Sequence, residues 1–404
     1  MLVAEFNNQK TNKDNSQTET SQILRGRDIL CFSHDWTGDP LSKTHIARVL
    51  SKDNRILWIN SIGYRTPTAS TKDVKRALNK MKAFTEPIRE VEPNIFVLNP
   101  LAIPIYNNES VKAVNTKWLQ MQVKKGMRKL GFKNPFNLVF HPPSGVAAGK
   151  LGEKEIVYYC VDEYSAFTGV SAEAMLNYEK SLIDKSDFVI VSAEKLYETK
   201  SKLHSKTFLI RHGVDFSHFQ KALNANTKIP DEIANLPRPI IGFHGLLADW
   251  VDFELIKKTA EYFKSGSIVL IGKIAVDAEQ KVKILNDVKN IHFLGRKLYS
   301  DLPNYCKGFD VALNPFAISE LTLAANPLKV REYLAAGLPV ISTDIPEVAI
   351  LEHCRIGQNH EDFIRQIEEA LKNPRPQKAI SDSVQNESWE ARVDELREII
   401  KTHI

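Results

Sequence analysis

Short apolar runs alternate with helix-like segments along most of this chain, and this alternation restricts its fold more than any other feature. In the first half, six runs have the length and apolar content of buried strands. Helical periodicity, as in residues 171–183, separates them. This order predicts a mostly parallel sheet that is covered by helices. The predicted strands are residues 29–33, 56–59, 95–98, 138–140, 156–160 and 188–191.

The alternation starts again after residues 223–239, which contain three prolines and little apolar periodicity. The chain therefore predicts two Rossmann-like α/β domains that are joined near residues 215–237. Its 404 residues, of which 43% are apolar, are enough for a core in each domain. The predicted elements of the second half are strands 240–243, 267–271, 291–294, 311–314 and 340–342, with helices 253–263, 327–336 and 360–371.

Four parts are expected in total. Residues 1–26 are polar and predict a disordered tail. Residues 27–215 form the first domain and residues 216–385 the second. In residues 386–404 a helix is expected to pack back on the first domain, because its apolar side chains share one face. Those side chains are Trp389, Val393, Leu396, Ile399 and Ile400.

Two parallel sheets that face each other place ligands in a cleft at the carboxyl ends of their strands. Residues 314–344 pass from a strand into a helix at such a place, with Asn326 as the expected N-cap. The helix N-terminus and Lys329 can bind a diphosphate, while Glu332 can accept hydrogen bonds from ribose hydroxyls. From the spacing alone, Lys329 and Glu332 could equally be a solvated pair on an ordinary amphipathic helix.

Three segments carry a family resemblance. NPLKVREYLAAGLPVIST (326–343) resembles the nucleotide-binding signature of retaining glycosyltransferases with the GT-B fold, the large family of group 1 glycosyl transferases. IRHGVDFSHF (210–219) and FLGRKLYSDLPNYCKGFDVALNPF (293–316) are similar to two further stretches of that family. The resemblance implies two Rossmann-like domains facing across a cleft, and it implies that Glu332 holds the ribose of the donor.

Two more segments narrow the resemblance. IIGFHGLLADWVDFELI (240–256) and YYCVDEYSAF (158–167) are similar to a bacterial branch with teichuronic-acid and exopolysaccharide transferases. The implied activity is transfer of a hexose-type sugar, with retention, from a UDP- or GDP-linked donor to a glycan or polyprenyl-linked acceptor. The sequence also leaves open a sugar-nucleotide epimerase, or a catalytically silent glycan-binding or scaffold protein of the same fold.

Cations and a glycine turn complete the expected donor site. Gly245 ends a strand and would let backbone approach the pyrophosphate. Arg296 could clamp the diphosphate and Lys273 could assist, although either could be a surface residue. No cofactor or metal is expected, because these charges would stabilise the leaving group and the four cysteines lack metal-ligand spacing.

Asp162 follows a buried-looking strand and is the expected catalytic residue, as the base for the acceptor hydroxyl, although a carboxylate there could also be a ligand for sugar hydroxyls. Glu163 beside it could bind sugar or cap a helix, since adjacent side chains point opposite ways. Val161 and Ala324 depart from the family, which has a histidine and the first of two glutamates there, and so the sugar contacts and the retaining outcome stay open. Asp35, Trp36 and His141 could bind acceptor or sugar, or could be structural.

Residues 72–133 have an excess of basic residues. They contain thirteen Lys and Arg but only five Asp and Glu. Residues 72–84 and 118–130 are amphipathic, so this region could contact an anionic membrane, or form two core-packed helices with solvated faces. No nucleic-acid motif accompanies the charge, and nucleic acid is not an expected partner. A cytoplasmic location is expected, because no window has the about 18 apolar residues of a spanning helix.

Overall fold

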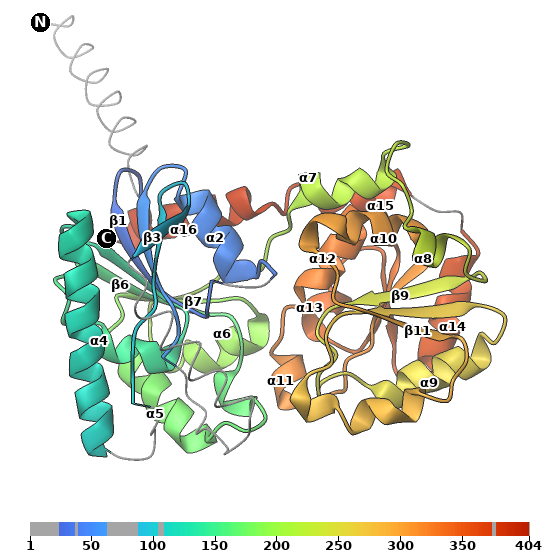
Figure 1. The fold of residues 1–404 in the computed structure, drawn as a ribbon, viewed down its shortest axis with the longest axis horizontal. Helices are drawn as coiled ribbons and strands as arrows, with labels where there is room; N and C mark the ends of the chain where they lie inside the picture. The colour runs from blue at the N-terminus through green and yellow to red at the C-terminus, as the bar shows by residue number, and fades with distance from the viewer. Residues whose placement is uncertain (1–23, 37–38, 63–87, 104–108, 374–376, 404) are drawn as a thin grey trace, which may run out of the picture.

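The computed structural model describes residues 24–36, 39–62, 88–103, 109–373 and 377–403. Most of the expected tail 1–26 and all of the expected helix 72–84 lie outside these residues. The described chain forms two α/β domains that lie side by side (Figure 1). The predicted pair of mostly parallel, helix-covered sheets is therefore confirmed.

The first domain is built on an eight-stranded sheet in which only the β3–β4 pair is antiparallel. Its central strands are apolar runs whose side chains are buried on both faces, as parallel sheets require. In sheet order the strands are β3 (Arg89–Glu92), β4 (Ile95–Leu98), β2 (Arg55–Ile59), β1 (Asp28–Phe32), β5 (Phe136–Val139), β6 (Glu155–Cys160), β7 (Phe188–Val191) and β8 (Thr207–Leu209). Its helices are α2 (Ser42–Leu50), α4 (Glu109–Leu130), α5 (Ala172–Ile183) and α6 (Glu194–Lys200).

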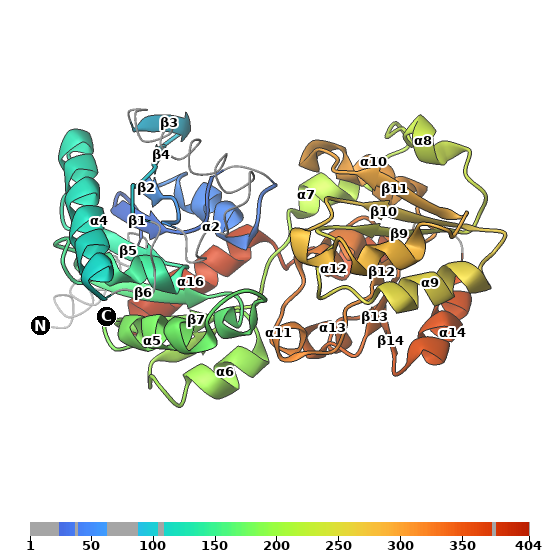
Figure 2. The same ribbon diagram turned by 60° about the horizontal axis from the view of Figure 1, so that its bottom comes forward.

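The second domain contains a six-stranded, wholly parallel sheet. In sheet order its strands are β11 (Ile291–Gly295), β10 (Ser267–Ile271), β9 (Ile240–His244), β12 (Val311–Asn314), β13 (Val340–Thr343) and β14 (Cys354–Gly357). Helices cover both faces of this sheet (Figure 2). They are α7 (Phe216–Phe219), α8 (Asp231–Ala234), α9 (Phe253–Tyr262), α10 (Leu302–Gly308), α11 (Glu320–Leu323), α12 (Leu328–Ala335), α13 (Pro346–Ala349), α14 (His360–Leu371) and α15 (Lys378–Asp382).

Three strands were not predicted from the sequence: β3, β8 and β14. Each of them lies at an edge of its sheet. An edge strand has one neighbour and a partly solvated face, so it needs no continuous apolar run. β3, with the sequence REVE, shows this most clearly.

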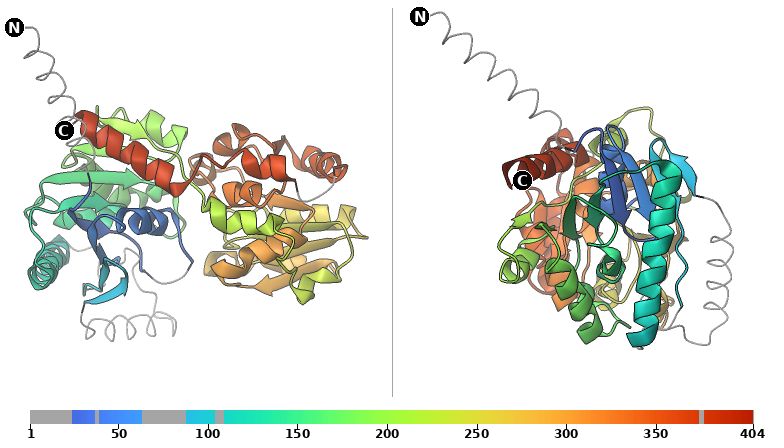
Figure 3. Two further views of the ribbon diagram at one scale, coloured as in Figure 1. Left: turned by 90° about the horizontal axis from the view of Figure 1, so that it is seen from above. Right: turned by 90° about the vertical axis from the view of Figure 1, so that its left-hand side faces the viewer.

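The chain crosses between the domains twice, and the two crossings lie side by side. The backbone N–H of Val214 donates to the carbonyl of Glu387 (2.8 Å). Gly213 permits this approach, because a Cβ there would lie 2.9 Å from the backbone nitrogen of Trp389. After the second crossing, α16 (Trp389–His403) returns to the first domain (Figure 3, left). Its buried side chains, Trp389, Val393, Leu396 and Ile400, join the core of the first domain, as predicted.

Candidate active site

A cavity of about 510 Å³ lies between the domains, where strands of both sheets end. The second domain contributes the turn after β9 and the N-terminal part of α12, and the first domain contributes the start of α2 and the residues after β6. Seven of the predicted site residues line this cavity. They are Asp162, Gly245, Lys273, Arg296, Asn326, Lys329 and Glu332.

Lys329 and Glu332 lie in the first turns of α12 and face the cavity. The ammonium of Lys329 lies 4.5 Å from the ring centroid of Phe316 and 5.1 Å from that of Phe243. Burial lowers the pKa of Lys329 to about 8, against the attraction of Glu332. Burial also raises the pKa of Glu332 to about 8, against the attraction of Lys329. Burial in the cavity thus disfavours both charges, and a ligand with matching groups would favour them.

Gly245 ends β9 in a turn that only glycine adopts readily, with φ of +140°. A Cβ at Gly245 would lie 2.7 Å from Cε of Lys329. The glycine therefore makes room for the Lys329 side chain, which crosses directly over the turn. His244, the residue before it, has its Nε2 atom 3.7 Å from Oε2 of Glu332. Burial lowers the pKa of His244 to about 3, so this ring is neutral.

Arg296 and Lys273 occupy the rim of the cavity. Arg296 binds Asp39 of the first domain through Nη2 (2.8 Å) and Nε (3.1 Å). Both side chains of this pair are well exposed. Lys273 is exposed as well. The predicted clamp, Arg296, is therefore paired with a first-domain carboxylate.

Asp162 is the carboxylate that the first domain presents to the cavity. Burial raises its pKa to about 6, against the attraction of Lys43 and with a smaller contribution from Glu163. The described residues form no hydrogen bond to its carboxyl group. A carboxyl with a raised pKa and free oxygens has the properties of a general base near neutral pH.

Glu163, predicted as a sugar ligand, does not line the cavity. Its carboxylate is buried and accepts hydrogen bonds from Lys200 (2.9 Å) and Ser165 (2.6 Å). Lys200 also donates to buried Glu179 (2.8 Å). Because adjacent residues at a strand end point opposite ways, Glu163 stabilises the first-domain interior while Asp162 faces the cleft.

Asp35, Trp36 and His141 also lie away from the cavity lining. The Trp36 ring packs edge-on against Trp58 in the first-domain core, with ring centroids 4.7 Å apart. Asp35 accepts a hydrogen bond from Ser61, and the buried ring of His141 shares one with Ser144 (2.8 Å). The structural interpretation of these three residues therefore fits the structure better than sugar binding.

Asn326 lines the cavity but does not cap α12, in contrast to the prediction. Its side chain reaches across the domain boundary instead, where Nδ2 donates to the carbonyl of Ser192 (2.7 Å). Nη1 of Arg331 donates to Oδ1 of Asn326 (2.7 Å). Nδ1 of His212 donates to the backbone carbonyl of Asn326 (2.8 Å). Both Nδ2 and Oδ1 of Asn326 are thus hydrogen-bonded, and the side chain would have to leave these partners to cap α12.

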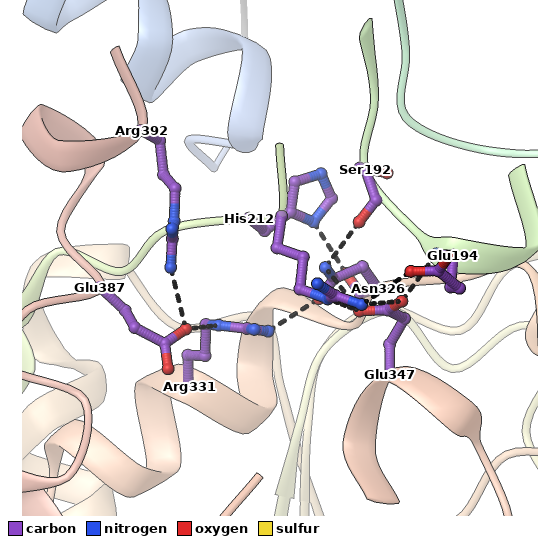
Figure 4. Close-up of polar contacts among 9 residues, drawn as sticks. Ser192, Glu194, His212, Asn326, Arg331, Glu347, Glu387 and Arg392 are labelled. Atoms are coloured by element: carbon purple, nitrogen blue, oxygen red, sulfur yellow. Dashed lines mark hydrogen bonds and ion pairs between the residues drawn. The ribbon is translucent and has the colours of Figure 1, made fainter. Parts of the chain in front are cut away.

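A buried polar network extends from Asn326 between the domains (Figure 4). Glu347 of α13 accepts hydrogen bonds from the backbone N–H of Glu194 (2.7 Å) and from Nε of Arg211 (2.8 Å). On the other side, Nε of Arg331 donates to Glu387 (2.6 Å) at the second crossing. The loop that leads into the cavity helix α12 is thereby fixed to the first domain and to both crossings.

Ala324 and Val161 mark the two departures from the family pattern. Ala324 is buried and packs into a core cluster of the first domain. Val161 is also buried, at the cavity wall. Both positions therefore hold apolar contacts where the family has polar side chains.

The cavity residues that were not predicted from the sequence include Lys43, His244 and Tyr299. His244 could have been found from its place beside Gly245. Lys43 is in the first turn of a helix in the first domain, and Tyr299 lies in a short 3-10 turn of the second. Neither position carries a local motif, and only the packing of the two domains brings them together.

The chain shares its architecture with solved glycosyltransferases. Sucrose-phosphate synthase from Thermosynechococcus elongatus superposes with a TM-score of 0.69 at 17% identity, covering 93% of this chain and 98% of that one. HepE of Anabaena in complex with UDP superposes with a TM-score of 0.63 at 13% identity, covering 93% of this chain and 100% of HepE. The catalytic domain of starch synthase IV from Arabidopsis thaliana, bound to ADP and acarbose, superposes with a TM-score of 0.62 at 12% identity. The match covers 94% of this chain and 99% of that domain. The predicted GT-B fold is confirmed.

Residues 238–373 match the family model of the glycosyl transferases group 1. This segment lies in the second domain, and the architecture of the described chain is the GT-B fold that the sequence motifs predicted. It is similar to TuaH of Bacillus subtilis (strain 168), which is named as a teichuronic acid biosynthesis glycosyltransferase. The two are 25% identical over 236 residues, and the match covers 54% of this chain and 58% of TuaH.

Proposed function

We propose that this protein transfers a hexose-type sugar from a UDP- or GDP-linked donor to a glycan or polyprenyl-linked acceptor in surface polysaccharide biosynthesis. The observation that carries the proposal is that Lys329 and Glu332 of the second domain line the same cavity as Asp162 of the first. The cavity thereby combines a cation for a diphosphate, a carboxylate for ribose hydroxyls and a separate carboxylate for the reacting acceptor.

Each residue has one task in this mechanism. Glu332 accepts hydrogen bonds from the ribose, and Lys329 neutralises charge that develops on the leaving nucleoside diphosphate. Asp162 accepts the proton of the acceptor hydroxyl as that oxygen bonds to the anomeric carbon. The donor and acceptor are aligned between the two domains, and water is displaced. The bond from the anomeric carbon to the diphosphate oxygen breaks as the new bond forms. The proposal uses no metal ion, and it assigns retention of the anomeric configuration, because the acceptor oxygen attacks from the same face that the diphosphate leaves; product NMR tests this outcome.

The relatives support the donor and acceptor classes. HepE is solved with UDP, and also with UDP and glucose, and starch synthase IV is solved with ADP and acarbose. TuaH is named as a glycosyltransferase of teichuronic acid biosynthesis. A nucleotide-diphosphate sugar and a growing surface glycan are therefore the substrates to test first.

Calorimetric titration with UDP, GDP, ADP and their glucose conjugates tests the proposal directly. Wild type should bind one nucleotide series, and Glu332→Ala should weaken that binding about tenfold to hundredfold, the effect of losing hydrogen bonds to a charged group. Glu320→Ala is the matched control, because Glu320 is exposed on the same domain and does not line the cavity. Absence of binding by wild type to every nucleotide would contradict the proposal.

Product analysis separates the rival functions. With a glycan or polyprenyl-linked acceptor, the proposal expects a glycosylated product and free nucleoside diphosphate. An altered sugar nucleotide formed without acceptor would instead identify an epimerase. Binding of sugar without turnover in any acceptor assay would identify a silent glycan-binding protein, the role that Ala324 and Val161 raised from the sequence.

We also propose that α4 contacts an anionic membrane. The buried face of α4 includes Leu119 and Val123. Its other face exposes Val114 (47%), Trp118 (40%) and Met121 (56%). Exposed lysines such as Lys124 and Lys125 accompany these apolar side chains. This helix lies on the outer side of the first domain, away from the second domain (Figures 1 and 3).

Co-sedimentation with vesicles tests this contact. The protein should pellet with vesicles rich in phosphatidylglycerol at low salt, and it should stay in the supernatant with pure phosphatidylcholine. Trp118→Ala with Met121→Ser should reduce the pelleted fraction. Leu203→Ser, at an exposed apolar side chain outside α4, should leave it unchanged. If the Trp118→Ala, Met121→Ser variant pellets with the vesicles as much as Leu203→Ser does, the proposed membrane surface is wrong. Among the described residues, no helix is long and apolar enough to span a bilayer.

A further inference from the structure

Lys43 is a buried cation that the mechanism above does not use. It lies in the first turn of α2 and lines the cavity from the first-domain side. Its residue exposure is 9%. Its ammonium lies 5.5 Å from the ring centroid of Tyr164, and no acceptor among the described residues hydrogen-bonds to it. No carboxylate of the described residues is within ion-pair distance, although Asp162 attracts the ammonium from farther away.

A buried ammonium without an acceptor destabilises a folded protein, because desolvation is not compensated. Burial accordingly lowers the pKa of Lys43, and Asp162 opposes that shift. Lys200, by contrast, is also buried but pairs with both Glu163 and Glu179. Lys43 therefore differs from a structural buried lysine of the same domain in having an open position that faces the cavity.

The N-terminus of α2 opens onto the same position. Pro40, Leu41 and Ser42 line the cavity beside Lys43. The first turn of this nine-residue helix contains no acidic residue. Oγ1 of Thr44 accepts a hydrogen bond from the N–H of the N-cap residue Leu41 (3.4 Å), but no side chain of the described residues accepts from the first N–H groups of the helix itself. Unpaired N–H groups and the positive end of the helix dipole thus add to the charge of Lys43 and favour an anion.

We propose that Lys43 and the N-terminus of α2 form an anion subsite for the distal phosphate of a nucleoside diphosphate. The inference deepens the proposed function and rests on it. If Glu332 holds the ribose, the phosphates extend from the second domain towards the first. Lys329 then binds from one side and Lys43 from the other, so that the diphosphate joins the two domains.

Calorimetry with truncated ligands tests this subsite. Wild type, Lys43→Met and Lys43→Gln are titrated with UDP, UMP and uridine, or with the guanine series if wild type prefers it. Lys43→Met should weaken UDP binding about tenfold to hundredfold and change UMP binding less than about twofold. Lys202→Met, at an exposed lysine of the first domain, is the matched control and should change neither.

The ligands for which Lys43→Met loses affinity decide whether Lys43 binds the distal phosphate. An equal loss for UMP and UDP, or a loss confined to UDP-sugars, would overturn the assignment to the distal phosphate. Unchanged UDP binding in Lys43→Met would overturn the subsite while leaving the proposed function intact. If wild type binds no nucleotide at all, it is the proposed function that fails.

Thermal unfolding without ligand provides an independent check. Because Lys43 lacks an acceptor, Lys43→Met and Lys43→Gln should melt at or above the wild-type temperature. A lowered melting temperature for both variants would identify Lys43 as a structural cation and overturn the inference.

Discussion

Arg296 of the second domain binds Asp39 of the first across the rim of the cavity, through hydrogen bonds of 2.8 and 3.1 Å. Both side chains also line that cavity. Asp39 raises the pKa of the guanidinium by hydrogen bonding and charge, which keeps Arg296 fully ionised. The cation that could clamp a diphosphate therefore has a carboxylate beside it that would compete with the diphosphate.

Asp39→Asn should strengthen nucleoside diphosphate binding by about twofold to fivefold, because the diphosphate no longer has to displace an exposed ion pair. Arg296→Ala should weaken binding. Calorimetry at low and at high salt measures both effects, and the gain from Asp39→Asn should shrink as salt rises. Asp287→Asn, at an exposed carboxylate outside the cavity, is the control. Weaker binding in Asp39→Asn would show that Asp39 is itself a ligand contact.

Asn326 offers a second prediction, on stability. Asn326→Ala removes the acceptor of Arg331 and the donor to Ser192, and both of these groups are buried. Each unsatisfied buried group costs about 1–3 kcal/mol, so the free energy of unfolding should fall by at least that amount. Urea denaturation measures it. Asn286→Ala, at an exposed asparagine, should be neutral. An unchanged unfolding midpoint in Asn326→Ala would mean that the network relaxes without cost.

The central strands of both sheets were predictable, because a strand with two neighbours is buried on both faces and is apolar throughout. The edge strands β3 and β14 were not, since solvent satisfies one side of each. The same distinction holds in the site. Lys329 and Glu332 are positioned by one local helix, which the sequence encodes within a few residues.

Residues that depend on the docking of the two domains escaped prediction. Lys43 and Lys329 line the same cavity only because the two sheets face each other, and no spacing along the chain records this. Asn326 has the sequence context of an N-cap, but a carbonyl 134 residues away accepts its amide. Glu163 and Asp162 are adjacent, and only the exit direction of β6 decides which one faces the cavity.

Asp162 gives a third prediction. Because burial raises its pKa to about 6, the carboxylate form that acts as a base is lost as pH falls through that value. For wild type, kcat/KM should therefore fall on the acid side with an apparent pKa near 6. Asp162→Asn should lower kcat by about 10²–10⁴-fold and leave nucleotide affinity nearly unchanged. Steady-state kinetics from pH 5 to 8 measure this, with Asp184→Asn, an exposed residue of an ion pair, as the control.

Ionisation of Asp162 should raise activity but lower the stability of the fold. The folded-state pKa of Asp162 is above its ordinary value of 3.8, so the native state binds protons more tightly than the unfolded state. Its ionisation therefore destabilises the fold as pH rises from about 4 to about 6. Asp162→Asn should raise the melting temperature at pH 7.5, and the difference should vanish near pH 4. An equal difference at both pH values would show that the raised pKa is not the cause.

Lys329 gives the last prediction, on the pH dependence of donor binding. Burial lowers its pKa to about 8, so the ammonium loses its proton as pH rises through that value, whereas the phosphates of UDP are already ionised. The Kd for UDP, or for whichever diphosphate wild type prefers, should then rise by up to about tenfold for each pH unit above 8. Uridine, which lacks phosphate, should show no such slope.

Two variants separate Lys329 from its neighbour Glu332, whose pKa is also about 8. In Lys329→Met, binding should be weak at every pH and the slope should be lost. In Glu332→Gln, binding should be weaker but the slope should persist, because the titrating ammonium remains. If the slope instead disappears in Glu332→Gln and persists in Lys329→Met, the carboxyl group controls the pH dependence, and the diphosphate does not depend on the charge of Lys329.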